Sequence, residues 1–523
     1  MYQRAWAADI AACCKQRLLV RLFLATASLA SVQTTLAASD SARNPDEEIP
    51  ATEATDKAQA GANSASEGNA AVTEAGATVL PEMVVTGEVK RDTHYTSPSS
   101  RVTRADIERQ NAQTTEEVLK YQPSLQIRQR YIGDPNGVLS IRGADMFSTA
   151  RNMVFADGLP LHNQLQASFN GAPRWSLVGP NEIDAVDIVY GPFSAEYSGN
   201  SIGGVVNFTT RMPYQKEFYA EGSYFVQPWE FLGADEGTFE GNRQYVSAGN
   251  RFGDLSVFLA YNRLEAESQP QSYLFDNTGL GGPGPGQTPV TGAVRVLDTR
   301  GTPSLIFGDT GPEDVDTHLV KLKLGYDLRP DLQVLFTGAY ESRDRLTESP
   351  RNYLRTASGD LYFGDNRPSA TDLAGTNSTD DAIFESSGFN VQNNGFGLSE
   401  DDRETLILGL QLRGAVGNNW DIDTTASYVD VFEDTRAQSN FNPSDPRNSG
   451  TGRIQDFETF NWKNYDLKLS TPALLGSDKL AFLGGYHFDN YDLGFKQFGR
   501  DRSSAPIYAA IAQGVVSSLS RWG

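Results

Sequence analysis

The sequence predicts an antiparallel membrane β-barrel that follows a compact α+β domain. Two observations support this fold class. After residue 215, apolar and polar residues alternate over runs of about 8–14 residues, as expected of half-buried strands. These runs are joined by connections that are alternately short and long. A soluble β-sandwich gives the same alternation, but short turns on one side and long loops on the other are typical of outer-membrane barrels.

Composition and charge exclude several classes of function. The 523 residues carry a formal net charge of -22, which argues against a nucleic-acid partner because such binding needs a basic face. Beyond the N-terminus no run of ~18 apolar residues occurs, so membrane-spanning helices are not predicted. Both cysteines, Cys13 and Cys14, precede the expected cleavage site. The mature chain is therefore expected to lack disulfides and thiolate metal ligands.

The first 81 residues are predicted to be processing and linker segments. Residues 1–38 have the pattern of a signal peptide, in which basic residues precede an apolar stretch with a cleavage site at Ala37 or Ala38. Residues 39–81 are rich in Ala, Glu, Ser and Thr and contain no aromatic residue. That composition is typical of a disordered linker.

A short β-prone segment, residues 82–88, follows the linker. Its core is the run Glu82, Met83, Val84, Val85, Thr86 and Gly87. An isolated strand cannot bury its two faces, but it can pair with the edge of a partner's sheet. The alternative is that this segment forms the first strand of the next domain.

Residues 95–212 predict the α+β domain. Thr103 is a suitable cap for a helix over TRADIERQ, and Thr114 or Thr115 for a second helix that Pro123 stops. Strands are expected at 125–128, 138–142 and 153–156, the last followed by a turn at Asp157-Gly158.

A glycine-rich stretch closes this domain. In EIDAVDIVYGPFSAEYSGNSIGGVVNFTT, residues 182–210, two strand-like runs flank a turn that begins at Gly191-Pro192. Glycine-rich loops also bind phosphate, but that requires a helix to start behind the loop. Here a β-branched run follows, so the stretch predicts a hairpin rather than a nucleotide site.

Residues 215–523 predict the strands of the barrel. Nine strands are expected, near 217–226, 242–250, 253–264, 317–327, 331–343, 403–413, 419–431, 461–470 and 479–492. The long connections span 265–316, 344–402 and 432–460. Aromatic residues at strand ends are typical of membrane-interface girdles, and here they are Tyr219, Tyr326, Trp420, Trp462 and Tyr486.

Taken together, these motifs resemble a TonB-dependent outer-membrane receptor. Residues 82–87 look like a TonB box, and SIRG at 140–143 and DGLPL at 157–161 look like segments of the family's plug domain. The turn GPFSAEY and the strand IGGVVN look like the end of the plug. Two departures are Tyr190, where the family often has Arg, and Ser198, where it often has Gly. Any plug–barrel ion pair made by that Arg is therefore in doubt.

The resemblance implies active uptake of a scarce ligand across the outer membrane of a Gram-negative bacterium. The ligand it implies is a ferric siderophore; haem, cobalamin and oligosaccharide are the alternatives. The implied partners are TonB with its inner-membrane energising complex and outer-membrane lipid. No catalytic residue, no metal site and no intrinsic cofactor are expected, and iron enters only as part of a bound ferric chelate.

The resemblance also suggests roles for residues of the plug. Arginines and aromatics in plug loops suit an anionic chelate, although ordinary solvated loop residues look the same; the ligand-binding candidates are Arg128, Arg130, Tyr131, Phe147, His162, Asn163, Gln164 and Phe169. Structural roles are expected for Arg142, as a buried partner, and for Gly143, Asp157, Gly158, Gly191, Pro192, Tyr197, Gly203 and Gly204.

Such barrels need about 22 strands to close around a plug, and about nine are expected here. An open edge in lipid leaves backbone groups unsatisfied. The expectation is a C-terminally truncated receptor, with a non-functional product as an alternative. A passive porin or adhesin is disfavoured by the box and plug. A signal-transducing receptor needs a folded stretch of ~80 residues before the box, where the sequence predicts a linker.

Overall fold

The computed structural model describes residues 98–144, 151–162, 173–191, 197, 201–232, 234–276, 280–283, 287–347, 350–364, 382–391, 396–417, 419–442, 444–446, 448, 452–477, 479–500 and 512–522. All of them belong to one compact unit, Glu88–Gly523. The predicted signal peptide, linker and TonB box lie outside the described residues. In the described part of the chain, no helix has the length and apolar character needed to cross a membrane.

The small domain is built on a five-stranded sheet in the order β1-β6-β7-β4-β5. Its strands are β1 (Ser99–Thr103), β4 (Asn152–Ala156), β5 (Leu159–Pro160), β6 (Ile183–Tyr190) and β7 (Gly204–Thr210). A separate hairpin pairs β2 (Leu125–Arg128) with β3 (Val138–Ile141). The strands predicted from the sequence at these places are therefore present.

The two predicted helices differ in outcome. Helix α2 (Arg104–Gln110) begins at Thr103, whose side chain and that of Asp106 cap each other's backbone amides, as predicted. The second helix is only a 3-10 turn, η1 (Glu116–Leu119). Thr115 makes no cap there, and its hydroxyl donates to the carbonyl oxygen of Val178.

The glycine-rich stretch forms the predicted hairpin. β6 and β7 pair antiparallel, with Tyr190 opposite Gly204, and the Gly191 amide donates to the Gly203 carbonyl oxygen at 3.0 Å. A Cβ on Gly204 would lie 2.5 Å from the Val189 carbonyl oxygen. Only glycine therefore fits at this close approach of two backbones. Pro192 lies outside the described residues.

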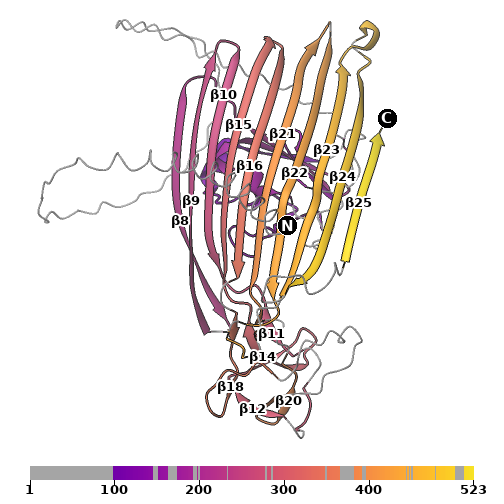
Figure 1. The fold of residues 1–523 in the computed structure, drawn as a ribbon. Coiled ribbons are helices and arrows are strands. Elements are labelled where there is room, and N and C mark those ends of the chain that lie inside the picture. Colours follow the sequence, from indigo (N-terminus) through magenta and orange to yellow (C-terminus); the bar gives the residue numbers. More distant parts are fainter. Residues whose placement is uncertain are drawn as a thin grey trace, which may run out of the picture. The chain divides into compact units, whose positions relative to one another are not determined.

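In the described residues after 216, the ten long strands form one antiparallel sheet (Figure 1). In chain order its strands are β8 (Glu217–Phe231), β9 (Ala234–Phe252), β10 (Leu255–Ser268), β15 (Glu313–Arg329), β16 (Leu332–Thr347), β21 (Ser399–Val416), β22 (Trp420–Ser439), β23 (Gly452–Thr471), β24 (Phe482–Arg500) and β25 (Ala512–Trp522). This confirms the predicted fold class. The count of nine was too low: β25 escapes prediction because Ser517, Ser518 and Ser520 interrupt its apolar alternation.

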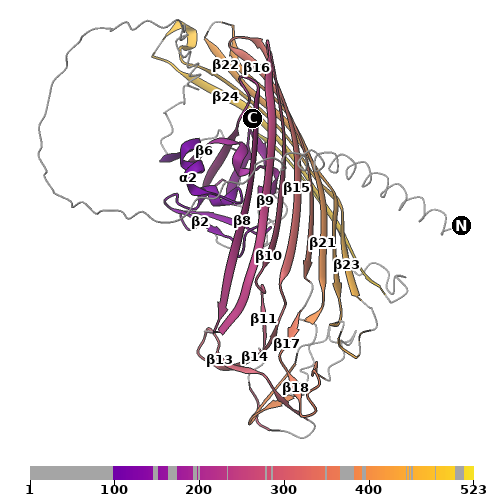
Figure 2. The same ribbon diagram turned by 90° about the vertical axis from the view of Figure 1, so that its left-hand side faces the viewer.

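The sheet has two chemically different faces. On β10, Leu255 and Leu259 are exposed on the outer face, whereas Phe258 and Ala260 are buried on the inner face. The inner face lies against the small domain (Figure 2). Trp462 was predicted at a membrane interface, which is wrong: its side chain is 0% exposed, and its indole N–H donates to the Pro160 carbonyl oxygen at 3.1 Å.

The two long connections before β15 and before β21 fold together at one end of the sheet, here called the loop end (Figure 1). The other end, with the short connections, is called the turn end. The loop strands are β11 (Tyr273–Phe275), β12 (Thr288–Thr291), β13 (Val294–Leu297), β14 (Pro303–Asp309), β17 (Arg351–Asn352), β18 (Arg355–Thr356), β19 (Ala382–Phe384) and β20 (Ser387–Phe389). They share a core that includes Phe307, Leu354 and Phe389.

The close approach at Gly204 gives a test of the hairpin. We expect Gly204→Ala to lower the free energy of unfolding by about 1–3 kcal/mol, because the new methyl group overlaps the backbone of β6. Urea denaturation in detergent micelles measures this. The matched control is Gly222→Ala on β8, where a Cβ meets nothing within 4 Å. Equal stability of the two variants would contradict this account.

Candidate functional site

Two buried lysines of β15 connect the sheet to the small domain. The Lys321 ammonium lies 2.6 Å from Glu182 Oε1 and donates to the Leu177 carbonyl oxygen at 2.7 Å. The Lys323 ammonium lies 2.9 Å from Asp157 Oδ2. Both carboxylates lie at the end of the small domain's sheet where β7 ends, since Glu182 precedes β6 and Asp157 follows β4, and both contacts go to one strand of the large sheet. They fix the small domain on the inner face.

Asp157 is held as a carboxylate. Burial by itself would raise its pKa, but the charge of Lys323 and hydrogen bonds from Thr210 hold the pKa below the usual value. Asp157 has a φ of 48°, and Gly158, with a φ of 79°, completes the tight turn. The turn predicted at these residues therefore places the Asp157 carboxylate where Lys323 of the sheet can bind it. Asp157 is therefore the residue of this turn that pairs with Lys323.

The predicted ligand-binding residues Arg128, Arg130 and Tyr131 lie in and beside one loop of the small domain. The Arg130 guanidinium binds Asp134 through Nε and Nη2, at 2.9 and 2.8 Å. The Tyr131 hydroxyl donates to Glu313 Oε2 at 2.8 Å, at the start of β15. The loop is thus placed at the loop end of the sheet. Arg128 is half-buried and has interaction partners of its own.

The other predicted ligand residues have a different outcome. His162 is 2% exposed, and burial and the nearby charge of Arg174 lower its pKa to about 4. It is therefore a neutral side chain packed inside the domain rather than a loop residue open to a ligand. Phe147, Asn163, Gln164 and Phe169 lie outside the described residues.

Arg142 was expected to be buried, and this is wrong. It is exposed, with a φ of 53°. Its Nη1 donates to the Gly191 carbonyl oxygen at 2.9 Å, and its guanidinium lies 5.7 Å from the centre of the Tyr190 ring. Tyr190 stands where the family often has Arg, and its aromatic ring contacts the Arg142 guanidinium. Its hydroxyl bonds to Ser100 at 2.9 Å.

Three more predicted structural residues, Tyr197, Gly143 and Gly203, lie near this hairpin. Tyr197 accepts a hydrogen bond from Asn207 at 3.3 Å and packs against Phe155. Gly143 has a φ of 73°, the left-handed region that favours glycine. A Cβ on Gly203 would lie 2.0 Å from Asn152 Oδ1. Close packing therefore requires glycine at 203, whereas the backbone conformation favours it at 143.

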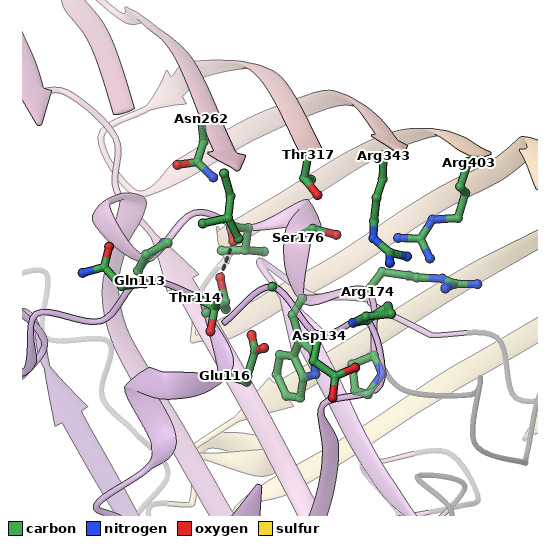
Figure 3. A pocket seen from close by; sticks show the side chains of 18 residues that line it. Gln113, Thr114, Glu116, Asp134, Arg174, Ser176, Asn262, Thr317, Arg343 and Arg403 are labelled. Carbon is green, nitrogen blue, oxygen red and sulfur yellow. Dashed lines mark hydrogen bonds between the residues drawn. The ribbon is translucent and has the colours of Figure 1, made fainter. Parts of the chain in front are cut away.

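A small cavity of about 50 Å³ lies between the small domain and the sheet (Figure 3). The small domain contributes Glu116, Asp134, Arg174 and Ser176 among its lining residues. The sheet contributes side chains from four strands, which are Asn262, Leu264, Thr317, Arg343 and Arg403. Arg343 and Arg403 lie directly opposite each other on β16 and β21. The cavity therefore brings several arginines together.

Glu116 lies on the wall of this cavity and is neutral near pH 7. Burial raises its pKa to about 8. Its Oε1 accepts a hydrogen bond from Gln129 at 3.2 Å. The residue therefore contributes no full negative charge to the cavity at neutral pH.

Sequence reasoning missed the basic residues of the sheet that face the small domain. Lys321 and Lys323 look in the sequence like the polar half of an alternating strand, and no role was predicted for Arg343 or Arg403. The available signal was a charged residue at successive inward positions of a strand whose other face is apolar. That signal marks the inner face, but it does not name the partner on the small domain.

Comparison with known proteins places the small domain in a family and finds similar folds. Residues 91–205 match the TonB-dependent Receptor Plug Domain family. The fold is similar to the RagAB peptide importer, with 10% identity, a TM-score of 0.50, and coverage of 81% of this chain and 52% of that chain. The ferric yersiniabactin uptake receptor FyuA from Yersinia pestis matches at 12% identity and a TM-score of 0.49, with 81% of this chain covered. The chain spans 61% of the length of FyuA.

The first prediction from this site concerns Glu116. The pKa of a glutamate in the unfolded chain is ~4.3. Below that pH the Glu116 carboxyl is protonated in both the folded and the unfolded state, and its contribution to stability is fully present. As the pH rises towards the folded pKa of about 8, the unfolded chain releases its proton first, so the contribution is lost. We expect Glu116→Gln to gain stability over the wild type between pH 5 and 8, on the order of 1–3 kcal/mol.

Denaturation at a series of pH values checks this. The matched control is Glu108→Gln, at an exposed glutamate of α2. A difference between Glu116→Gln and wild type that stays constant from pH 5 to 8 would show that Glu116 ionises normally.

The second prediction concerns the Lys323–Asp157 pair. Lys323→Met leaves a buried carboxylate unpaired and is expected to cost about 3–5 kcal/mol of unfolding free energy. Adding Asp157→Asn is expected to restore part of that loss, and a double-mutant cycle measures the coupling. Lys479→Met, at an exposed lysine, is the control. Additive single-variant effects would mean that the pair does not hold the small domain in place.

Proposed function

We propose that this TonB-dependent receptor of the Gram-negative outer membrane imports a scarce ligand with energy supplied through TonB, and that the ligand is a ferric siderophore. The family is one of transport receptors. The observation that carries the proposal is the seating of the plug, residues 99–210, on the inner face of the sheet by buried ion pairs. A plug held in this way obstructs passive diffusion, so transport requires work to move it.

The path for that work starts at the predicted TonB box, residues 82–87. A strand of TonB added to this segment would pull on the chain that leads to β1. β1 is an edge strand whose ladder with β6 joins Ser99 to Val189 and Thr103 to Ala185. Force applied from the N-terminal side therefore loads this short ladder first. Beyond it lie β6 and the ion pair of Glu182 with Lys321.

The contacts of the loop of residues 129–137 favour a ligand site at the loop end of the sheet. The Arg130 guanidinium already binds a carboxylate, and Tyr131 already donates to one. An anionic chelate that replaced Asp134 or Glu313 would keep these hydrogen bonds and loosen the loop from β15. Gln269 also bonds to the Arg130 carbonyl oxygen at 2.8 Å, and Gln227 accepts from the Ile132 amide at 3.3 Å. Ligand binding and release of the plug would thereby be coupled.

The box gives the decisive test. We expect Val85→Pro to reduce uptake to background, because proline lacks the N–H that an added strand must donate. Uptake is measured as radioactive iron accumulated by iron-starved cells that produce this chain as their sole receptor. The iron is supplied as catecholate and hydroxamate siderophores and as haem, and uptake of radiolabelled cobalamin, oligosaccharide and peptide is measured in parallel.

Ala70→Pro in the predicted linker is the matched control, with the same substitution outside the box. We expect it to transport as the wild type does. Uptake that survives Val85→Pro, or that continues when the proton-motive force is removed, would overturn the proposal.

A further inference from the structure

Three arginines converge on the cavity between plug and sheet (Figure 3). Arg174 comes from the plug, Arg343 from β16 and Arg403 from β21, and their exposed fractions are 5%, 6% and 6%. Arg403 donates to Glu341, which is also bonded by Ser176, and the Arg174 guanidinium lies 5.2 Å from the centre of the Phe460 ring. A buried group of like charges is costly unless anions compensate it.

The carboxylates around the cavity are already engaged by arginines. Glu341 pairs with Arg403, and Asp134 pairs with Arg130. The remaining pairs are Arg345 with Glu313 and Asp401, and Arg436 with Asp434. Glu116 on the cavity wall is protonated at neutral pH. Among the described residues, these pairs leave Arg343 without a carboxylate of its own.

Arg343 presents a specific pair of donors. Its Nε and Nη2 are buried and meet no hydrogen-bond acceptor in the described part of the chain. The same two nitrogens of Arg130 bind Asp134 at 2.9 and 2.8 Å, and those of Arg263 bind Asp316 at 3.1 and 2.8 Å. This edge of a guanidinium matches the two oxygens of a carboxylate or phosphate group. The Nε of Arg403 also lacks an acceptor among these residues.

We propose that this cavity binds an oxyanion, held by the Nε and Nη2 edge of Arg343 with Arg174 and Arg403 beside it. A volume of about 50 Å³ is several times what one water needs, so a carboxylate or phosphate group fits and a whole siderophore does not. The source is the acid group of the imported ligand or a free inorganic anion. Assigning the imported ligand as the source rests on the proposed function; binding itself does not.

Calorimetric titration of the full chain in detergent micelles with inorganic phosphate, at constant ionic strength, tests the site. The wild type is expected to bind, and Arg343→Gln to bind at least about tenfold more weakly, since a charge-assisted hydrogen bond is lost. Arg413→Gln, at an exposed arginine further along β21, is the control and should bind as the wild type does. No binding by the wild type, or equal binding by Arg343→Gln, overturns the proposal.

A second variant keeps the test decisive if Arg343→Gln fails to fold. Thr317 lies directly opposite Arg343 on β15 and lines the cavity. Thr317→Asp supplies an internal carboxylate at the same place, so it is expected to raise the unfolding temperature and abolish phosphate binding. A Thr317→Asp protein that binds phosphate as the wild type does would refute the site.

Titration with citrate separates the two sources. Binding of citrate that also depends on Arg343 supports the acid group of an organic ligand, and binding of phosphate alone supports a free inorganic anion. The Val85→Pro variant should still bind phosphate. A failure of TonB-dependent import therefore leaves this measurement intact, and a failure of phosphate binding leaves the import assay intact.

Discussion

The position of the plug depends on charged side chains that the sheet buries on its inner face. Lys321 and Lys323 are buried, and they donate hydrogen bonds to Glu182, Leu177 and Thr210 of the plug. Lys323 also pairs with Asp157. A buried ion pair adds little net stability, but a buried charge without its partner is very costly. If the plug were shifted along the sheet, both lysines would remain buried without their partners. The pairs therefore determine where the plug sits rather than how strongly it adheres.

Adhesion comes from a different set of contacts. The apolar core of the plug continues into inward side chains of the sheet, which are Leu319, Ala339, Ile407, Val429, Val431, Phe460, Trp462 and Tyr491. Apolar contacts are tolerant of small shifts because the hydrophobic effect has no direction. Charged groups regain hydration when water enters, so the polar part of the interface separates at a lower cost than a dry one of equal area. In the proposed transport cycle, such a combination suits a plug that is seated accurately and still moves.

Local pattern predicted most of the strands and little of the interface. Alternation with a period of two is a property of neighbouring residues, so it identified the hairpin of β6 and β7 and nine of the ten long strands. The alternation indicates which side chains share a face of a strand, but it does not identify the residues that this face contacts. Trp462 meets Pro160, which is 302 positions away in the chain, and no local signal contains that contact. The parallel pairing of β12 with β19 inside the long connections is equally non-local.

Inward cations follow one another along the middle of the sheet. From the loop end, Arg345 and Arg343 lie on β16 opposite Val315 and Thr317, and Lys321 and Lys323 continue the row on β15. Inward residues on one strand are about 7 Å apart. Beyond Arg343 the next inward pair is Leu319 with Glu341, and Lys321 follows one inward position later. Glu182 of the plug occupies that lysine. In the proposed cycle, the plug movement that withdraws Glu182 would therefore both open the path and expose the next cation along it.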